Sequence, residues 1–212
     1  MANIDFTQVF IVFLVLLFSL TIHEAAHAWS ADRLGDPTAR LLGRVSLNPA
    51  VHVDPIGTIV FPLIALMTSL PILGWAKPVP VSTPRLGRNW KEKFMMIAAA
   101  GPASNILIAV GCSIALRLVE ASVDEGGGGV GMAGSVLVLA IRLNVLLAVF
   151  NMIPVPPLDG GNVLAGLLHG RAAAAYDGLR QYGFIILYAL MFSGVLWRIV
   201  LPPQNVILSW LL

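Results

Sequence analysis

Two histidines and a glutamate lie together in the run His23-Glu24-Ala25-Ala26-His27, near the end of an apolar segment. On an α-helix four residues advance 400°, so His23 and His27 project from one face about one turn apart. Two imidazoles in that arrangement can each offer one nitrogen to the same zinc ion at roughly 2.0–2.1 Å. Glu24 projects about 100° away from His23, which suits proton exchange with a water molecule better than metal ligation. The run therefore predicts a zinc site in which Glu24 is the general base.

A catalytic zinc ion usually has three protein ligands and a water molecule, so a third donor must come from elsewhere in the chain. A closed structural site would need four protein ligands, which fits this sequence less well. The candidate donors outside the first segment are His52, Asp54, Asp159, His169 and Asp177.

Asp159 is the preferred third ligand. It follows a proline-rich run at 154–157, where missing N–H groups and fixed φ angles break the preceding helix. Gly160 and Gly161 then allow the backbone to turn sharply before a helix resumes. A carboxylate on a broken helix at membrane depth is costly unless it binds something. The alternative is that Asp159 caps the following helix, and capping does not exclude ligation.

Four further polar residues allow more than one interpretation. Asn105 and Asn151 lie on apolar segments, where their amides could hold a substrate strand or a developing oxyanion, or could join helices by hydrogen bonds. His52 could approach the zinc ion, line a path for water and substrate, or stabilise a surface turn. Arg142 lies inside an apolar segment and has no role assigned from the sequence.

Composition predicts that these residues sit in a membrane protein. Hydrophobic residues make up 58 % of the 212 residues and charged residues only 11 %, with a mean hydropathy of +0.86. A soluble domain carries about 25 % charged residues, so this chain cannot cover itself with a water-compatible surface. The composition excludes a cytosolic enzyme, a disordered tail and a nucleic-acid-binding module. The single cysteine excludes an internal disulfide framework.

The apolar segments predict an all-α, polytopic helical bundle with about five to six membrane segments. A helix of about 26 residues would reach roughly 39 Å, so the histidines lie in the last third of a spanning helix. The whole chain, 1–212, reads as one domain whose metal-binding helices lie within 6–31, 94–119 and 131–169. A small strand or hairpin is expected at 40–47, and an interfacial tail at 205–212. The membrane segments are expected at 6–31, 56–73, 94–119, 131–153 and 182–201.

Charge asymmetry predicts the orientation. Residues 74–93 hold five basic residues and one acidic residue, whereas 120–130 hold three acidic residues and no basic one. The positive-inside rule places the first stretch in the cytoplasm and the second outside. Because the 32–55 segment also carries three arginines, we expect 56–73 to re-enter on the cytoplasmic side, in preference to an ordinary span. The active site and the small hairpin then face the cytoplasm.

Three motifs together resemble those of the site-2 protease family of intramembrane zinc metalloproteases. They are the H-E-x-x-H run at 23–27, Gly101-Pro102 with Asn105, and the run from Asn151 to Gly161. The resemblance covers roughly 9–170 and is closest to compact prokaryotic members without an inserted PDZ domain.

The resemblance implies a peptidase with one catalytic zinc ion, bound by His23, His27 and Asp159, and with Glu24 as the catalytic acid/base. It also implies substrates that are transmembrane proteins or leftover signal peptides in the lipid bilayer of a prokaryotic plasma membrane. Two other functions remain open at this point. One is a metal transporter or channel that uses the His/His/Asp site, and the other is an inactive relative that binds membrane partners. The sequence gives no indication of the oligomeric state.

Overall fold

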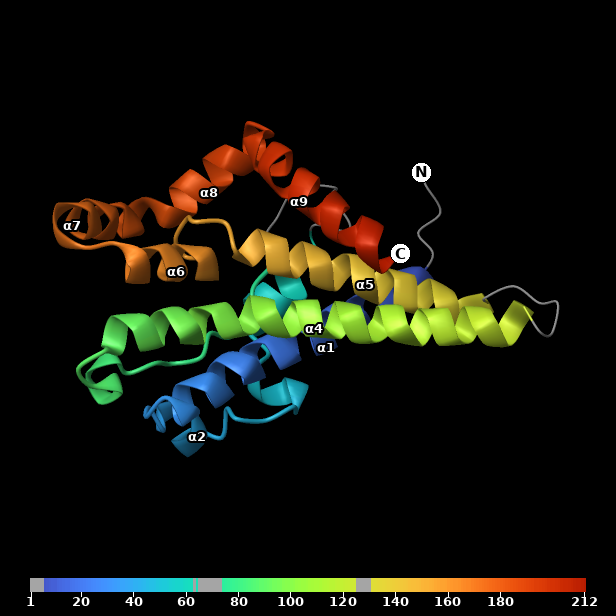
Figure 1. Cartoon of the computed structure of the whole chain (residues 1–212), viewed down its shortest axis with the longest axis horizontal. Coiled ribbons are helices and arrows are strands. Elements are labelled where there is room, and N and C mark those ends of the chain that lie inside the picture. Colours follow the sequence, from blue (N-terminus) through green and yellow to red (C-terminus); the bar gives the residue numbers. More distant parts are fainter. Residues whose placement is uncertain (1–5, 63, 65–73, 125–130) are drawn as a thin grey trace.

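The computed structural model describes residues 6–62, 64, 74–124 and 131–212, and every regular element in those ranges is a helix. Figure 1 shows these helices packed lengthwise, with no sheet in the part of the chain described. In chain order they are α1 (Phe6–Arg33), α2 (Thr38–Leu41), the 3-10 helix η1 (Pro49–Val51), the π-helix η2 (Pro55–Val60), the 3-10 helix η3 (Thr83–Leu86), α4 (Trp90–Asp124), α5 (Gly131–Asn151), α6 (Asp159–Leu167), α7 (Gly170–Leu179), the 3-10 helix η4 (Arg180–Tyr182), α8 (Gly183–Phe192) and α9 (Val195–Leu211).

Three of these helices, α1, α4 and α5, are long and apolar enough to cross a membrane. The α7–α8 segment and α9 together would make a fourth span, although they are bent by 79° at the break between them. The all-helical membrane architecture is therefore confirmed. The described residues contain three or four candidate membrane segments, fewer than the five to six predicted. Of the predicted re-entrant segment at 56–73, residues 63 and 65–73 lie outside the described residues.

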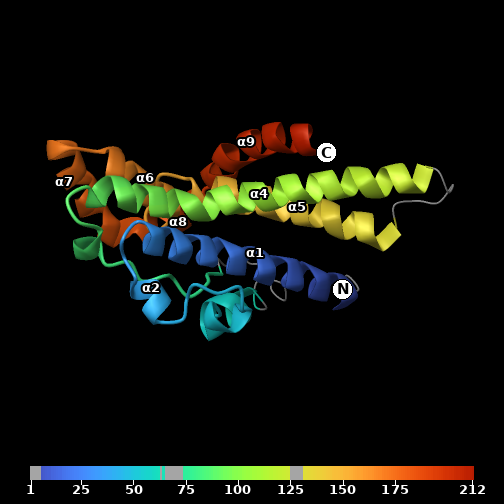
Figure 2. The same cartoon turned by 60° about the horizontal axis from the view of Figure 1, so that its bottom comes forward.

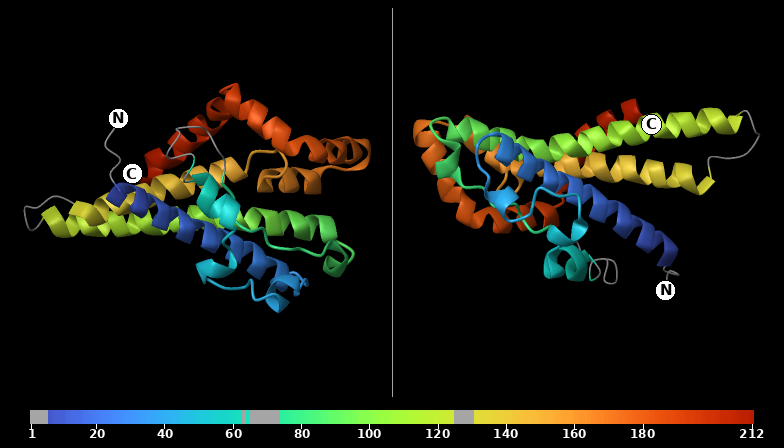
Figure 3. Two further views of the ribbon diagram at one scale, coloured as in Figure 1. Left: turned by 180° about the vertical axis from the view of Figure 1, so that it is seen from behind. Right: turned by 90° about the horizontal axis from the view of Figure 1, so that it is seen from below.

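The long helix α4 lies at the centre of the bundle, against α1, α5 and α6. Figure 2 shows α1 and α5 running beside it, and both views of Figure 3 agree. Between α4 and α5 the contact is apolar, formed by buried Ala109, Leu116, Ile141 and Val145. Helices α1 and α6, which carry the candidate metal ligands, both lie against α4.

The predicted membrane segment at 182–201 is wrong as a single helix. The chain breaks between α8 and α9 at Gly194, which has a φ of 74°. This left-handed conformation is unstrained only for glycine, so it ends α8 and lets the chain turn back. The 205–212 tail then packs on the α4–α5 core through Ile207, Leu208 and Leu211, where the sequence predicted an interfacial position.

The predicted strand or hairpin at 40–47 is also wrong. Residues 38–41 form α2, and turns follow, with Gly43 at a φ of 69°. The buried guanidinium of Arg44 donates a hydrogen bond to the carbonyl oxygen of Lys77. A side chain rather than a strand ladder therefore ties this segment to residues 77–78.

Substituting Gly194 by alanine tests the joint between α8 and α9. Gly194→Ala should lower the free energy of unfolding by about 1–2 kcal/mol, because a Cβ is disfavoured at positive φ. Thermal unfolding of the purified protein in detergent measures the change. Gly178→Ala is the matched control, since Gly178 lies in α7 with open space around it and no positive φ. A Gly194→Ala protein as stable as the wild type would contradict the assignment of strain.

Candidate metal centre

Helix α1 carries the H-E-x-x-H run on the face that packs into the bundle. His23 is 4 % exposed and His27 is 8 % exposed, although both are polar groups within an apolar helix. Their ring centroids lie 4.7 Å apart with the planes nearly perpendicular. The two rings therefore have the one-turn spacing predicted from the sequence, and both are buried within the bundle.

Asp159 reaches these rings because the chain folds back between α5 and α6. Helix α5 ends at Asn151, turns occupy the proline-rich stretch, and α6 begins at Asp159 itself. A Cβ on Gly160 would lie 2.2 Å from the carbonyl oxygen of Met152, so only glycine permits this close return of the backbone. The break and the glycine together place a carboxylate beside α1.

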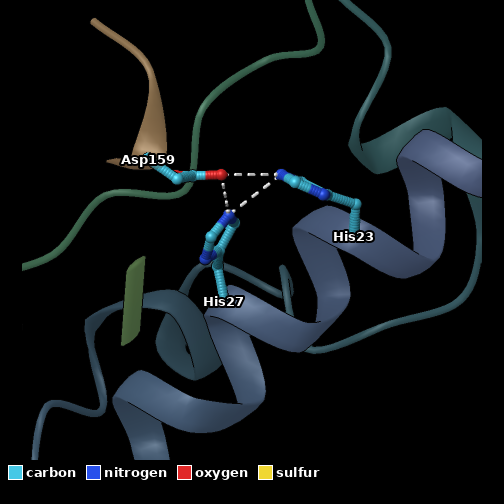
Figure 4. Close-up of side chains that lie close together, drawn as sticks. All are labelled: His23, His27 and Asp159. Atoms are coloured by element: carbon cyan, nitrogen blue, oxygen red, sulfur yellow. Dashed lines mark hydrogen bonds and ion pairs between the residues drawn. The ribbon is translucent and has the colours of Figure 1, made fainter. Parts of the chain in front are cut away.

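The three side chains point toward one another, as Figure 4 shows. The Nε2 atoms of His23 and His27 are 3.1 Å apart, and Oδ2 of Asp159 lies 3.1 Å from the first and 3.3 Å from the second. Ligands of a tetrahedral zinc ion with bonds of about 2.0 Å are about 3.3 Å apart. Among the described residues Oδ2 of Asp159 is buried and accepts no hydrogen bond. Both observations fit a zinc ion held by these three atoms.

Helix α4 holds both imidazoles by their other nitrogen. Nδ1 of His27 lies 2.7 Å from the carbonyl oxygen of Ile97, and Nδ1 of His23 lies 2.6 Å from Oδ1 of Asn105. Because each Nδ1 donates to an oxygen, each Nε2 keeps its lone pair for a metal ion. The sequence predicted the ligands but not these supporting contacts.

The cluster forms part of the wall of a cavity of about 550 Å³. Glu24 is half-buried on the same wall, one residue from His23 and clear of the three-atom cluster. The cavity is also lined by Trp75, Ala76 and other residues of the 74–81 segment, and by Phe184 of α8. The cavity therefore brings an acid/base candidate, a metal site and an irregular backbone segment into one space.

The remaining predicted site residues fall into two groups. Asn151 lines the cavity and stays a candidate for substrate contact. Asn105 is fully buried behind the cluster, a position that favours the interhelical hydrogen-bond alternative. His52 is buried away from the cavity lining, and its Nε2 lies 2.8 Å from the carbonyl oxygen of Ser46, which favours the turn-stabilising alternative.

The other candidate ligands do not join the cluster. Asp54 accepts hydrogen bonds from the backbone at the start of η2, His169 is exposed before α7, and Asp177 pairs with Arg180. Arg142 is exposed on α5.

Two residues near the cluster were missed as functional positions. A Cβ on Gly101 would lie 2.3 Å from Nε2 of His27 and 2.6 Å from Nε2 of His23, so α4 approaches the rings at a glycine. The signal was the Gly101-Pro102 motif, which was noted in the sequence without a mechanism. Asn144 of α5 bonds to Asn105, and its signal is the one that marks Asn105 and Asn151, a polar side chain on an apolar segment.

Comparison with known proteins identifies one protein family and several relatives. The model of peptidase family M50 matches residues 120–193, which include Asp159. "Putative zinc metalloprotease YwhC" of Bacillus subtilis is 34 % identical over 92 % of this chain and 88 % of that protein. Two Rip2 proteins with the same description, from Mycolicibacterium smegmatis and Mycobacterium tuberculosis, are 30 % and 26 % identical, and the chain spans 66 % of each. No solved structure matches the chain.

Substituting Gly101 by alanine tests the packing of α4 against the two imidazoles. Gly101→Ala should weaken zinc binding at least about tenfold, because both Nε2 atoms must move by more than the ~0.2 Å that a metal site tolerates. Zinc content after dialysis, and competition with a chromophoric chelator, measure the effect. Gly111→Ala, on the same helix with open space around it, should leave zinc binding unchanged. Equal zinc affinity in both variants would refute the close-approach argument.

Proposed function

Because the chain belongs to peptidase family M50, as its similarity to YwhC establishes, we propose that His23, His27 and Asp159 hold its zinc ion. The protein is an intramembrane zinc metalloprotease that acts on membrane proteins. The observation that carries the site assignment is the triangle of two Nε2 atoms and one carboxylate oxygen, with edges of 3.1–3.3 Å. No observation favours the metal-transport alternative.

The chemistry follows from the residues that face the cavity. A bound zinc ion supplies Lewis-acid activation of a water molecule and of the scissile carbonyl. Glu24 accepts the proton that the attacking water loses, and passes it to the amine nitrogen as the carbon–nitrogen bond breaks. The Nδ1 atoms of His23 and His27 bond to oxygen atoms of α4, so the Nε2 atoms are the ones that face the cluster. Asn151 lines the cavity and is proposed to contact the substrate backbone.

The orientation proposed is with the site toward the cytoplasm of a prokaryotic plasma membrane. The end of α1 that carries the histidines leads into the 32–55 segment, which holds three arginines, and α4 begins within the basic 74–93 segment. Both segments lie at the same end of the bundle, since Lys93 donates hydrogen bonds to the carbonyl oxygens of Leu34 and Leu86. By the positive-inside rule this end is cytoplasmic. Substrates would be transmembrane proteins or signal-peptide-like segments.

The 74–82 segment is suited to hold an unwound substrate. The N–H groups of Trp75 and Lys77 donate to the carbonyl oxygens of Gly57 and His52. In an extended chain, the N–H groups of residues i and i+2 point to one side, and the N–H and C=O of the residue between them point to the other. The hydrogen bonds of Trp75 and Lys77 follow this pattern. The residue between them is Ala76, which lines the cavity and pairs with no other described residue.

We propose that this open edge pairs with an extended substrate segment beside Glu24. A transmembrane helix must unwind before hydrolysis, and backbone pairing gives the unwound segment partners that the bilayer lacks. The sequence placed such an edge at 40–47 or 56–73, and the structure favours the segment that follows them. Asp36 supports it from the far end, since its carboxylate accepts a hydrogen bond from the N–H of Ser82.

Replacing the catalytic acid/base tests the function directly. Glu24→Gln should lower cleavage about 10²–10⁴-fold, because the amide cannot transfer the proton, while zinc content stays at the wild-type level. A tagged single-span membrane protein in detergent serves as substrate, with zinc measured on the same samples. Loss of zinc in Glu24→Gln, or cleavage at the wild-type rate, would contradict the assigned role. Metal flux that does not depend on Glu24 would support transport instead.

Removing the N–H of Ala76 tests substrate pairing. Ala76→Pro should lower kcat/KM about tenfold, since a backbone hydrogen bond contributes about 0.5–1.5 kcal/mol and the ring also obstructs the edge. Zinc content should not change, because Ala76 does not contact the cluster. Ala76→Ser keeps the N–H and should keep turnover. If the proline and serine variants cleave equally well, the pairing model is wrong.

A further inference from the structure

A chain of buried polar side chains runs from α1 through α5 and α4 to the metal centre. Ser19 on α1, Asn144 on α5 and Asn105 on α4 are each at most 3 % exposed. Asn144 bonds to Ser19 over 2.9 Å, Asn105 bonds to Asn144 over 2.9 Å, and His23 bonds to Asn105 over 2.6 Å. Three membrane helices are therefore joined by one hydrogen-bonded path that ends on a proposed zinc ligand.

The far end of this path fixes the direction of every hydrogen bond in it. Nδ2 of Asn144 lies 2.9 Å from the carbonyl oxygen of Ala140, which can only accept. The amino group of Asn144 must therefore point to that carbonyl, and its Oδ1 must face Asn105. The amino group of Asn105 donates to this oxygen, and its own Oδ1 faces His23.

Only one tautomer of His23 satisfies this arrangement. Because Oδ1 of Asn105 carries no hydrogen, Nδ1 of His23 must donate, and the lone pair then lies on Nε2. Nε2 is the atom in the triangle with His27 and Asp159. His27 needs no such path, since its Nδ1 donates directly to the carbonyl oxygen of Ile97. The orientation of His27 is thus fixed by a backbone carbonyl of α4. The orientation of His23 is fixed by the side chain of Asn105, whose amide is oriented in turn by Asn144 of α5.

We propose that Asn105 and Asn144 are positioning residues for zinc, which hold His23 in the Nδ1–H tautomer and in its ring orientation. This proposal rests on the zinc site proposed above, and it gives Asn105 a role different from the substrate or oxyanion contact predicted from the sequence. If the two residues served only to join helices, their loss would change stability and leave the metal's environment as it was. If they position His23, the metal's affinity and coordination change as well.

Substitutions at Asn105 separate these two possibilities. Asn105→Leu keeps a similar volume, removes the acceptor, and should weaken zinc binding about tenfold to a hundredfold, the range found when such supporting residues are lost. Asn105→Asp keeps an acceptor oxygen toward Nδ1 and should restore most of that affinity. Asn144→Leu leaves Asn105 free to turn its amide, so it should weaken binding less than Asn105→Leu does.

Zinc affinity is measured by chelator competition on the purified protein, and the coordination by the visible absorption of the cobalt(II)-substituted form. Ser113→Ala is the matched control. Ser113 is also buried on α4 and its hydroxyl donates an interhelical hydrogen bond to the carbonyl oxygen of Leu211, but it has no path to the cluster. Its loss should lower the unfolding temperature without changing zinc affinity or the cobalt spectrum.

The wild-type protein provides a test that needs no variant. With ¹⁵N-labelled histidine, the zinc-loaded protein should show a proton bonded to Nδ1 of His23. An Asn105→Leu protein with wild-type zinc affinity and cobalt spectrum would overturn the positioning role while leaving the zinc site intact. A proton on Nε2 would overturn both the positioning role and the zinc site, because a protonated Nε2 has no lone pair for the metal ion. A folded wild-type protein that binds no zinc would instead overturn the proposed function, and the positioning role with it.

Discussion

The convergence of two imidazoles and one carboxylate inside an apolar bundle is the interaction on which the rest of the structure depends. An acidic group at the centre of a membrane helix costs about 2.5–3.5 kcal/mol on insertion scales. Here Asp159 and both histidines are largely buried, and the carboxylate oxygen has no hydrogen-bond donor among the described residues. A divalent cation offsets these costs, because all three atoms become its ligands.

The surrounding helices can be understood as the means of bringing those three atoms together. Helix α4 approaches the rings closely at Gly101 and accepts their Nδ1–H groups at Ile97 and Asn105. The prolines after α5 interrupt the helix within the bundle, and Gly160 lets the chain return so that Asp159 faces α1. Glycines and helix breaks are therefore concentrated where the polar atoms meet. Away from the metal centre, α4 packs against α5 and α9 through apolar side chains.

The sequence could bring the three proposed ligands together because the position of each depends on local rules. The 3.6-residue period places His23 and His27 on one face, and the proline run followed by Gly160 predicts a broken helix that exposes Asp159. It predicted the C-terminal half poorly. At 182–201, hydropathy alone cannot distinguish one membrane-spanning helix from two shorter helices. The chain forms two helices there because it breaks at Gly194, which has a positive φ. The 40–47 strand was wrong because the side chain of Arg44 fixes that segment through a distant carbonyl. Asn144 carries the same signal as Asn105, a polar side chain on an apolar segment, but the contact between them joins residues 39 positions apart and could not be inferred from the sequence.

X-ray absorption at the zinc edge, recorded on the purified protein, tests the central claim most directly. The account predicts one zinc ion per chain, light-atom ligands at about 2.0–2.1 Å, scattering typical of two imidazoles, and no sulfur ligand. It also predicts that Asp159→Ala loses the zinc or changes its coordination. A protein without zinc, a sulfur ligand at about 2.3 Å, or a spectrum that Asp159→Ala leaves unchanged would contradict the account.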